Sequence, residues 1–167
     1  SLGTVTLYTH SEHAAIIEAR MKVNERSPVK VIKAAIKDAG GEGIIILDSP
    51  PGTSCPFVQT TDAADYVILV TEPTPFGLSD LKQSVETLRI MGKAFGVIIN
   101  RSDVGNNEVR SYLEEEKISL LLEIPYDRDI AHLYSEGKIA ADYDPGLKNR
   151  LESVIEKLIG KYGTGCN

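Results

Sequence analysis

A single apolar run, followed by an acid and a stiff turn, constrains the fold of this chain more than any other feature. The run is Ile44-Ile45-Ile46-Leu47, and it leads into Asp48 and then Ser49-Pro50-Pro51-Gly52. Consecutive large aliphatic residues are typical of a strand buried on both faces, as in a parallel sheet, and predict a strand over 43–48. Open parallel sheets bind ligands beyond the carboxyl ends of their strands, so Asp48 is expected at the rim of a site. An acid placed there commonly holds the magnesium ion of a bound nucleotide.

Composition indicates a globular chain and argues against several classes of function. The 167 residues are 42% apolar and 25% charged, which is enough for one domain with a sizeable core. The net charge of −6 offers no overall basic surface for nucleic acid, so no nucleic-acid partner is expected. No apolar run approaches a membrane span, and the two distant cysteines form no disulfide framework. A reducing, cytoplasmic setting without membrane attachment is therefore predicted.

Strand and helix signals alternate along almost the whole chain. Strands are predicted over 4–9, 43–48, 66–70, 95–99 and 118–123, and helices over 28–39, 56–63, 77–91, 106–116, 128–136 and 145–160. Residues 10–27 show no clear period, and the last residues, 161–167, are expected to form a flexible tail. This order predicts an α/β fold, a doubly wound and mostly parallel sheet with helices on both faces.

The turn after Asp48 presents one backbone donor in a fixed place. Neither Pro50 nor Pro51 carries an N–H, so the first donor after Ser49 is Gly52. Pro-Gly also suits a type II turn, in which glycine supplies a positive φ. Such a stiff segment could aim the Gly52 N–H at a γ-phosphate, although a plain tight turn fits this stretch equally well. Asp48 itself has a simpler interpretation as a helix N-cap. Cys55, shortly afterwards, is expected to be a small buried residue rather than a redox centre.

Polar residues also follow the later strands. Asn100 and Asp103 stand after the strand over 95–99, and Pro125, Tyr126 and Asp127 follow the last one. An amide has a donor and an acceptor, which match the amino group and ring nitrogen of adenine. The Asn-x-x-Asp spacing also resembles the guanine-reading motif of GTPases, which leaves guanine open. The simpler interpretations are an Asx-turn at Asn100 and a helix N-cap at Asp127.

Taken together, these stretches resemble the MinD/ParA/Mrp class of deviant-Walker P-loop ATPases. The resemblance is closest to the MinD-superfamily ATPases that carry an inserted ferredoxin domain. The segments that carry it are Asp48–Pro56, Ala64–Leu81, Val97–Asp103 and Ile124–Asp127, with weaker matches in Gly3–Leu7 and Ala19–Met21.

The resemblance implies a role for each matched residue. Asp48 would be the Walker B acid, holding Mg²⁺ through water, and Gly52 the switch glycine near the γ-phosphate. Asn100 would contact adenine, and the backbone of Pro125, Tyr126 and Asp127 would flank the base. Asp103 leaves GTP possible as the nucleotide, because its carboxylate could accept from guanine, but the family resemblance favours ATP. The parent protein is expected to be a dimeric ATPase that couples ATP hydrolysis to electron transfer or to metallocluster or cofactor assembly, with a metalloprotein or redox protein as a possible client.

The chain departs from the family pattern at its beginning. The glycine- and lysine-rich phosphate loop is absent, and so are the clustered cysteines of the ferredoxin insert, which would hold the iron–sulfur cluster. The chain therefore looks like the C-terminal part of such an ATPase, over residues 1–160. By itself it is expected to bind nucleotide poorly and to hydrolyse none. An exposed sheet edge is expected to associate with the missing N-terminal segment or with a second copy.

Two alternatives from other classes remain open on the residues alone. A receiver-like signalling module would use Asp48 as phosphoacceptor, with Thr71 at the next strand end. It would also need an acidic pair after the first strand and a late lysine, and Asn100-Arg101 stands where the lysine belongs. An amide-forming enzyme related to cobyrinic acid a,c-diamide synthase would need a glutaminase nucleophile, and Cys55 has no evident histidine partner.

Overall fold

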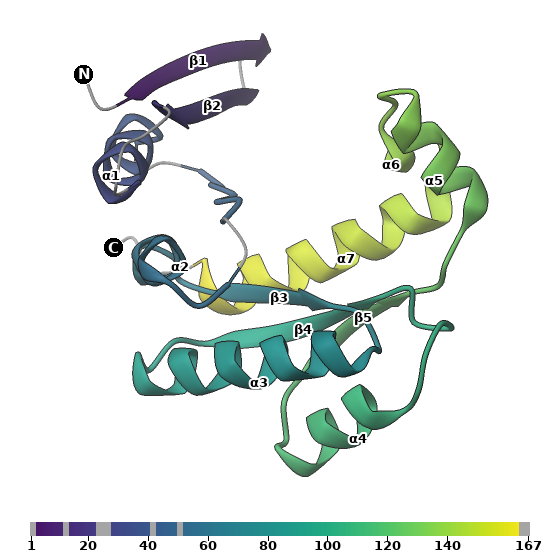
Figure 1. Ribbon diagram of the computed structural model, residues 1–167. Helices are drawn as coiled ribbons and strands as arrows, with labels where there is room; N and C mark the ends of the chain where they lie inside the picture. Colours follow the sequence, from purple (N-terminus) through teal and green to yellow (C-terminus); the bar gives the residue numbers. More distant parts are fainter. Residues whose placement is uncertain (1–2, 12–13, 23–27, 41–42, 50–51, 164–167) are drawn as a thin grey trace. The chain divides into compact units, whose positions relative to one another are not determined.

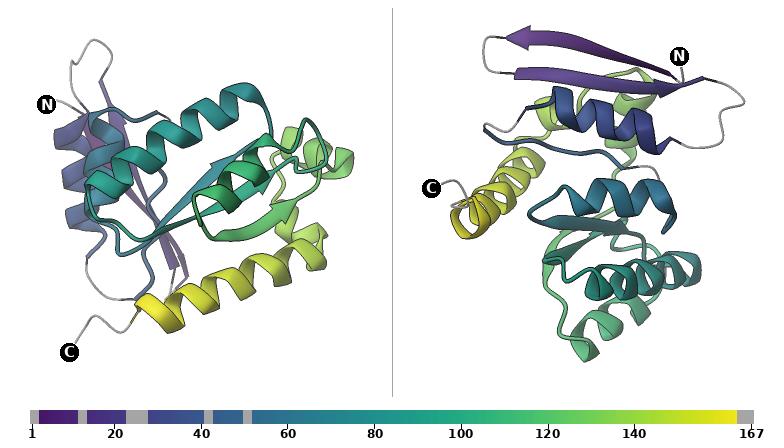
Figure 2. Two further views of the ribbon diagram at one scale, coloured as in Figure 1. Left: turned by 90° about the horizontal axis from the view of Figure 1, so that it is seen from below. Right: turned by 90° about the vertical axis from the view of Figure 1, so that its left-hand side faces the viewer.

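The computed structural model describes residues 3–11, 14–22, 28–40, 43–49 and 52–163, and the chain forms two compact units, Ser1–Ala64 and Asp65–Asn167. The second unit is a three-stranded parallel sheet, ordered β3 (Val67–Thr71), β4 (Phe95–Asn100) and β5 (Leu120–Ile124). Crossover helices α3 (Pro75–Ile90) and α4 (Glu108–Glu115) join the strands. They lie on one face of the sheet, whereas α7 (Pro145–Tyr162) lies on the other (Figures 1 and 2). The predicted α/β fold with a parallel sheet is confirmed.

The core of the second unit lies between the sheet and its crossover helices. Its fully buried side chains are Val85, Leu88, Val97, Ile99, Val109 and Leu113. β4 is central and buried along most of its length, which explains its unbroken apolar run. β3 buries alternate residues, and Ile68 and Val70 remain exposed. β3 lies at one edge of this sheet, and one of its apolar faces is uncovered in the described part of the chain.

Two short helices between β5 and α7 contain no buried residue. These are α5 (Arg128–Ser135) and α6 (Ala140–Tyr143). The sequence predicted α5 but not α6. Asp144 is the N-cap of α7, and its carboxylate accepts hydrogen bonds from the N–H groups of Gly146 and Leu147. It continues through Tyr162, beyond the predicted end of that helix at residue 160.

The first unit contains an antiparallel hairpin and two helices. β1 (Gly3–Ser11) pairs with β2 (Ala14–Met21), with an irregularity between Thr9 and Ser11. α1 (Val29–Asp38) packs against both strands and against α2 (Cys55–Asp62). The strand over 4–9 and both helices were predicted, whereas β2 was not. The doublets Ala14-Ala15 and Ile16-Ile17 break the alternation by which a half-buried strand is recognised.

The strand predicted over 43–48 is absent. Residues 44–49 belong to no helix or strand, and the backbone of Ile44–Asp48 makes no hydrogen bond with any described residue. Ile44 is 65% exposed and Ile46 79% exposed. The prediction was wrong on these residues because consecutive aliphatic residues become a buried strand only where neighbouring strands cover them, and the described chain provides none.

Candidate functional site

The carboxyl ends of the three parallel strands in the second unit form the candidate site. Asn100 ends β4 and is in register with Ile124, the last residue of β5, and Thr71 at the end of β3 is in register with Ile99. Parallel strands bring these ends to one edge of the sheet. The structure thus brings together Asn100, Asp103, Pro125, Tyr126 and Asp127, as the sequence predicted for strand ends of a parallel sheet.

Asp103 joins the two loops of this site. Its Oδ1 accepts a hydrogen bond of 2.6 Å from the backbone N–H of Tyr126. Beside it, the N–H of Ser102 donates to the carbonyl oxygen of Ile124 at 3.0 Å, and Ser102 is buried. These bonds fix the loop after β4 against the loop after β5. One oxygen of the Asp103 carboxylate is therefore engaged by the chain itself.

The Asn100 side chain is available for a ligand. It is half-buried, and no described residue forms a hydrogen bond with its amide group. Its backbone, by contrast, is fixed as the last residue of β4. An amide held on a strand end with its donor and acceptor unused is suited to reading the edge of a base. The Asx-turn considered from sequence would have needed a bond from this side chain to nearby backbone, and none is formed.

Arg101 adds a cation to the site that sequence reasoning missed. It adopts a left-handed backbone conformation with φ of 50°, which is uncommon for a residue other than glycine. Its Nε lies 3.5 Å from Oε1 of Glu72, and its guanidinium carbon lies 5.7 Å from the centre of the Tyr126 ring. Arg101 therefore connects the loops after β3, β4 and β5. Both members of the ion pair are about half exposed, so the pair contributes modestly to stability.

Arg110 of α4 joins the loop after β4 to β5. Its Nε donates to Oε1 of Glu123 at 2.6 Å, and its Nη2 donates to the carbonyl oxygen of Ser102, also at 2.6 Å. Sequence reasoning missed this residue as well. The guanidinium is planar with donors in a fixed arrangement, so it can hold a carboxylate and a carbonyl at once. Arg110 is a positioning residue, because it fixes the loop that carries Asp103.

Asp127 begins α5. Its Oδ1 accepts hydrogen bonds from the N–H groups of Asp129 at 2.7 Å and Ile130 at 3.3 Å. The helix N-cap considered from sequence is therefore confirmed. Pro125 and Tyr126 precede it and are exposed, but the Tyr126 N–H is already bonded to Asp103 and Pro125 has no N–H.

The two remaining predicted residues, Asp48 and Gly52, lie in the first unit. Asp48 is exposed and follows the unpaired apolar run, so its predicted place at the end of a buried strand is not observed. Gly52 has φ of 93°, the positive value predicted for a Pro-Gly turn. Pro50 and Pro51 lie outside the described residues.

Cys55 is exposed at the start of α2, so its predicted burial was wrong.

Asp48 fits a magnesium ion only as one ligand among several. In the described residues, no group of three or more histidine, cysteine or acidic side chains could hold a metal. Mg²⁺ is commonly held through one or two carboxylates, with water and substrate phosphates supplying the rest. The donor set thus fits an ion delivered with a nucleotide and does not fit a cage made of protein ligands.

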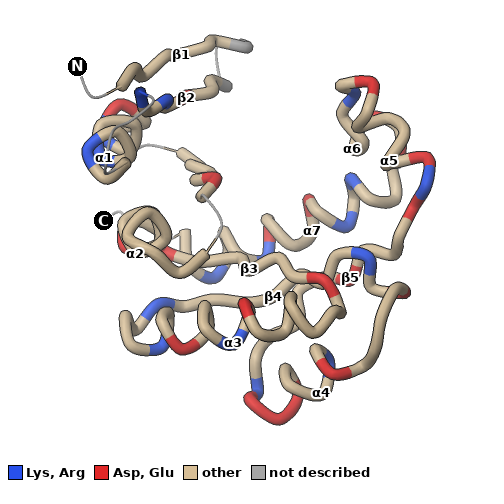
Figure 3. Tube along the Cα trace, viewed as in Figure 1, with Lys and Arg blue, Asp and Glu red and all other residues tan. Residues whose placement is uncertain are grey.

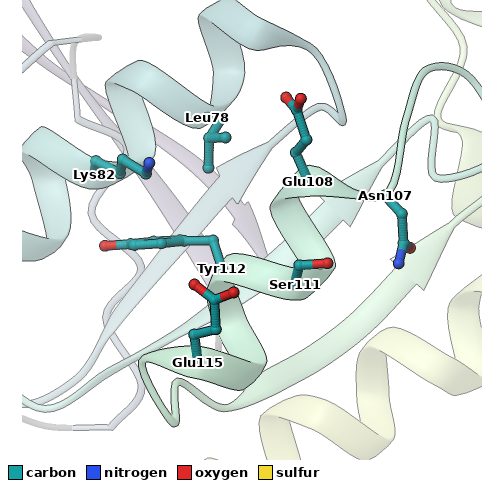
Figure 4. A pocket seen from close by; sticks show the side chains of 7 residues that line it. All are labelled: Leu78, Lys82, Asn107, Glu108, Ser111, Tyr112 and Glu115. Carbon is teal, nitrogen blue, oxygen red and sulfur yellow. The ribbon is translucent and has the colours of Figure 1, made fainter.

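Hollows on the surface lie away from the predicted residues. The larger one, about 530 Å³ and open, lies between α3 and α4 (Figure 4). Lys82 there stands 5.2 Å from the centre of the Tyr112 ring, and burial together with Glu116 raises the pKa of the Tyr112 phenol. A smaller hollow in the first unit is lined by Val5, Leu7, Ile17 and Asp38. None of the predicted site residues lines either hollow.

Charge is mixed over the helices of the second unit. Figure 3 shows basic and acidic residues interspersed along α3, α4 and α7.

No helix in the described ranges is both long and apolar enough to cross a bilayer.

Comparison with solved structures finds a similar protein of known fold. The cell division ATPase MinD of Pyrococcus furiosus superposes with a TM-score of 0.61 and 28% sequence identity, over 78% of this chain and 57% of that chain. The chain is similar to a MinD ATPase. That similarity combines fold with sequence, and it agrees with the family that the motifs indicated.

Two uncharacterized proteins match much of this chain in sequence, and their names give no activity. The chain is 28% identical over 150 residues to the uncharacterized protein MJ0579 of Methanocaldococcus jannaschii, covering 89% of this chain and 52% of that protein. It is 24% identical over 113 residues to MJ0578 of the same organism, covering 68% of this chain and 38% of that protein. The chain thus spans about half the length of MJ0579 and less of MJ0578. No protein-family model matches the chain.

Proposed function

We propose that this chain supplies the base-recognition side of an ATP site, together with the magnesium-binding acid, to a MinD-like ATPase. The observation that carries the proposal is the Asn100 amide on the end of β4, which no described residue bonds, beside loops that Asp103 fixes. The similarity to the MinD ATPase supports the same assignment. Asn100 would read adenine, and the backbone from Pro125 to Asp127 would flank the base.

The engagement of Asp103 favours adenine over guanine. A carboxylate that reads guanine accepts from two N–H groups of the base with both oxygens, whereas Oδ1 of Asp103 already accepts from the Tyr126 N–H. Asp103 then acts as a positioning residue, and the half-buried Asn100 amide is the group that would distinguish adenine from guanine. An amide offers the donor and acceptor pair that matches the adenine edge.

Asp48 and Gly52 would serve the phosphate end of the nucleotide. The exposed Asp48 carboxylate would hold Mg²⁺ through water, and the positive φ of Gly52 places its N–H in a turn suited to a γ-phosphate oxygen. When bound, Mg²⁺ would neutralise phosphate charge. Neither residue replaces a glycine- and lysine-rich loop, which we place on an N-terminal segment of the parent protein.

The parent protein would be a cytoplasmic, dimeric ATPase. Its hydrolysis of ATP would drive electron transfer or the assembly of a metallocluster or cofactor, with any iron–sulfur cluster held by the segment that this chain lacks. This part of the proposal rests on the resemblance of Asp48–Pro56 and Ala64–Leu81 to ATPases with a ferredoxin insert.

Calorimetric titration and a hydrolysis assay test the proposal on the chain as it stands. We expect Mg-ATP and AMP to bind with similar, millimolar affinity, since the triphosphate has no cradle here, and we expect no release of phosphate. Micromolar binding of Mg-ATP, or turnover by the chain alone, would show that this chain already holds a complete phosphate site. Either result would reject the proposal that the phosphate loop lies on another segment.

A further inference from the structure

Three lysines form a basic stripe along α1 in the first unit. Lys30, Lys33 and Lys37 are spaced at i, i+3 and i+7, so they lie on one side of the helix, and all three are exposed (Figure 3). We call this set the lysine stripe. No ion pair joins any of the three to a described residue, whereas Arg89 and Arg110 in the second unit each have a carboxylate partner.

The lysine stripe is unfavourable for the helix that carries it. Lys30 and Lys33 are like-charged neighbours at i, i+3, and Lys33 and Lys37 are like-charged neighbours at i, i+4. Lys30 also lies in the first turn of α1, where the helix dipole favours acids, and that turn contains no acidic residue. The three charges therefore lower the stability of α1, and an anionic group from outside the described chain would relieve their repulsion.

The opposite side of α1 is already used for packing. Val31 is buried, and α1 packs against β1, β2 and α2. A helix that binds at a membrane surface inserts its apolar face among the lipid headgroups, and α1 has no such face to spare. The exposed side that α1 offers to a partner is the lysine stripe.

We propose that the lysine stripe docks an acidic helix on the surface of a partner protein. Lys30 and Lys37 are two helical turns apart, which is about 10 Å along the axis. Carboxylates at the same spacing on a partner helix repeat over the same length, so each lysine can meet one carboxylate. The inference goes beyond the proposed function, because it concerns a surface of the first unit and requires no nucleotide.

Nucleic acid is a poorer occupant of this surface. A nucleic-acid site gains its affinity from many phosphate contacts along an extended polyanion. The lysine stripe is short, and the net charge of −6 on the whole chain opposes a long polyanion beyond the stripe. A short acidic helix meets the three lysines without extending over the acidic remainder of the chain.

NMR titration with a designed peptide tests the inference. The probe is an alanine-based helical peptide of about 20 residues that carries glutamates at i, i+3 and i+7, and its control has glutamine at those positions. With the glutamate peptide we expect shifts concentrated at the amides of α1 and an affinity that falls about fivefold between low and physiological salt. The glutamine peptide should not bind.

A pair of charge-matched variants locates the binding. The stripe variant combines Lys30→Gln, Lys33→Gln and Lys37→Gln, and it should weaken binding of the glutamate peptide by about tenfold. The control variant makes the same change in net charge at three exposed lysines of α7 and should weaken binding by less than about twofold. It combines Lys148→Gln, Lys157→Gln and Lys161→Gln.

Urea unfolding separates docking from a role of the lysine stripe in the fold. Because the stripe is unfavourable for α1, the stripe variant should unfold at the same urea concentration as the unaltered chain or at a higher one. Unfolding at a lower concentration would show that the lysines serve the fold and would overturn the inference.

Four binding results would also overturn it. These are no binding of the glutamate peptide, equal binding of the glutamine peptide, equal loss of binding in the two variants, and tighter binding of a DNA duplex or of phosphatidylglycerol vesicles through the same lysines. The last result would make nucleic acid or membrane the partner. Because no nucleotide is present, each result is independent of whether Asn100 reads a base.

Discussion

The Asp103 carboxylate accepts a 2.6 Å hydrogen bond from the backbone N–H of Tyr126, twenty-three positions later in the chain. This bond joins the loops that follow β4 and β5 at the same edge of the sheet. It engages one of the two oxygens that a carboxylate would offer to guanine, and it holds the Tyr126 backbone in a fixed place. The bond therefore affects both the stability of the site and the base that the site can accept.

Replacing Asp103 should loosen this edge of the sheet. Asp103→Ala removes a charge-assisted bond to a backbone donor, so we expect a loss of about 1 kcal/mol in the free energy of unfolding. Asp103→Asn keeps an acceptor and should lose less. The amide of Tyr126 should exchange faster in Asp103→Ala. Urea unfolding and hydrogen exchange measure both effects, with Asp80→Asn on exposed α3 as the control. Unchanged exchange at Tyr126 would contradict the role of Asp103.

Asn100 should control base binding without affecting the fold. Because no described residue bonds its side-chain amide, Asn100→Ala should change the free energy of unfolding by less than about 0.5 kcal/mol. The same change should weaken AMP binding at least tenfold, as expected for removing a paired donor and acceptor. Asn149→Ala, on the exposed side of α7, is the matched control. Equal AMP affinity in the two variants would rule out Asn100 as the reader.

Two glycines should respond to alanine in opposite directions. Gly105 has φ of 107°, and an added Cβ would fall on the Pro73 carbonyl oxygen, so Gly105→Ala should destabilise the fold by on the order of 2–3 kcal/mol. Gly160 lies within α7 with open space around it. There alanine should stabilise by up to about 1 kcal/mol. Thermal or urea unfolding compares them, and a neutral Gly105→Ala would show that the loop after β4 is free to shift.

Tyr66 should make stability fall at alkaline pH. Burial raises the pKa of the Tyr66 phenol, and Tyr162, whose ring centre lies 4.7 Å away, raises it further. The folded state holds this proton more tightly than the unfolded state. The contribution is thus fully present below the ordinary value of about 10 and is lost as pH rises through the raised value. Unfolding at pH 9 and pH 11 should differ less in Tyr66→Phe than in Tyr134→Phe, which alters an exposed phenol. The same drop in both variants would argue against the assignment.

Sequence reasoning succeeded where a segment carries its own signal. Buried β4 shows as the unbroken run before Asn100, and Asn100 and Asp103 lie where predicted, at and just beyond the end of that strand, because parallel strands end at one edge. It failed where burial depends on a neighbouring element, as at Ile44–Leu47. The apolar pattern there indicates residues that would be buried in a sheet, but it does not indicate which element would bury them. Arg110 and Arg101 were missed because their partners, Glu123 and Glu72, are joined to them only by the folded sheet.

Backbone-resolved NMR titration of the chain with AMP and with GMP tests whether the ends of β4 and β5 bind adenine. We expect millimolar AMP binding, with shifts concentrated at the amides of Asn100–Asp103 and Tyr126–Asp127, and weaker binding of GMP. Shifts centred elsewhere in the second unit, such as in the hollow between α3 and α4, or GMP binding as tightly as AMP, would contradict the assignment of an adenine site to the ends of β4 and β5.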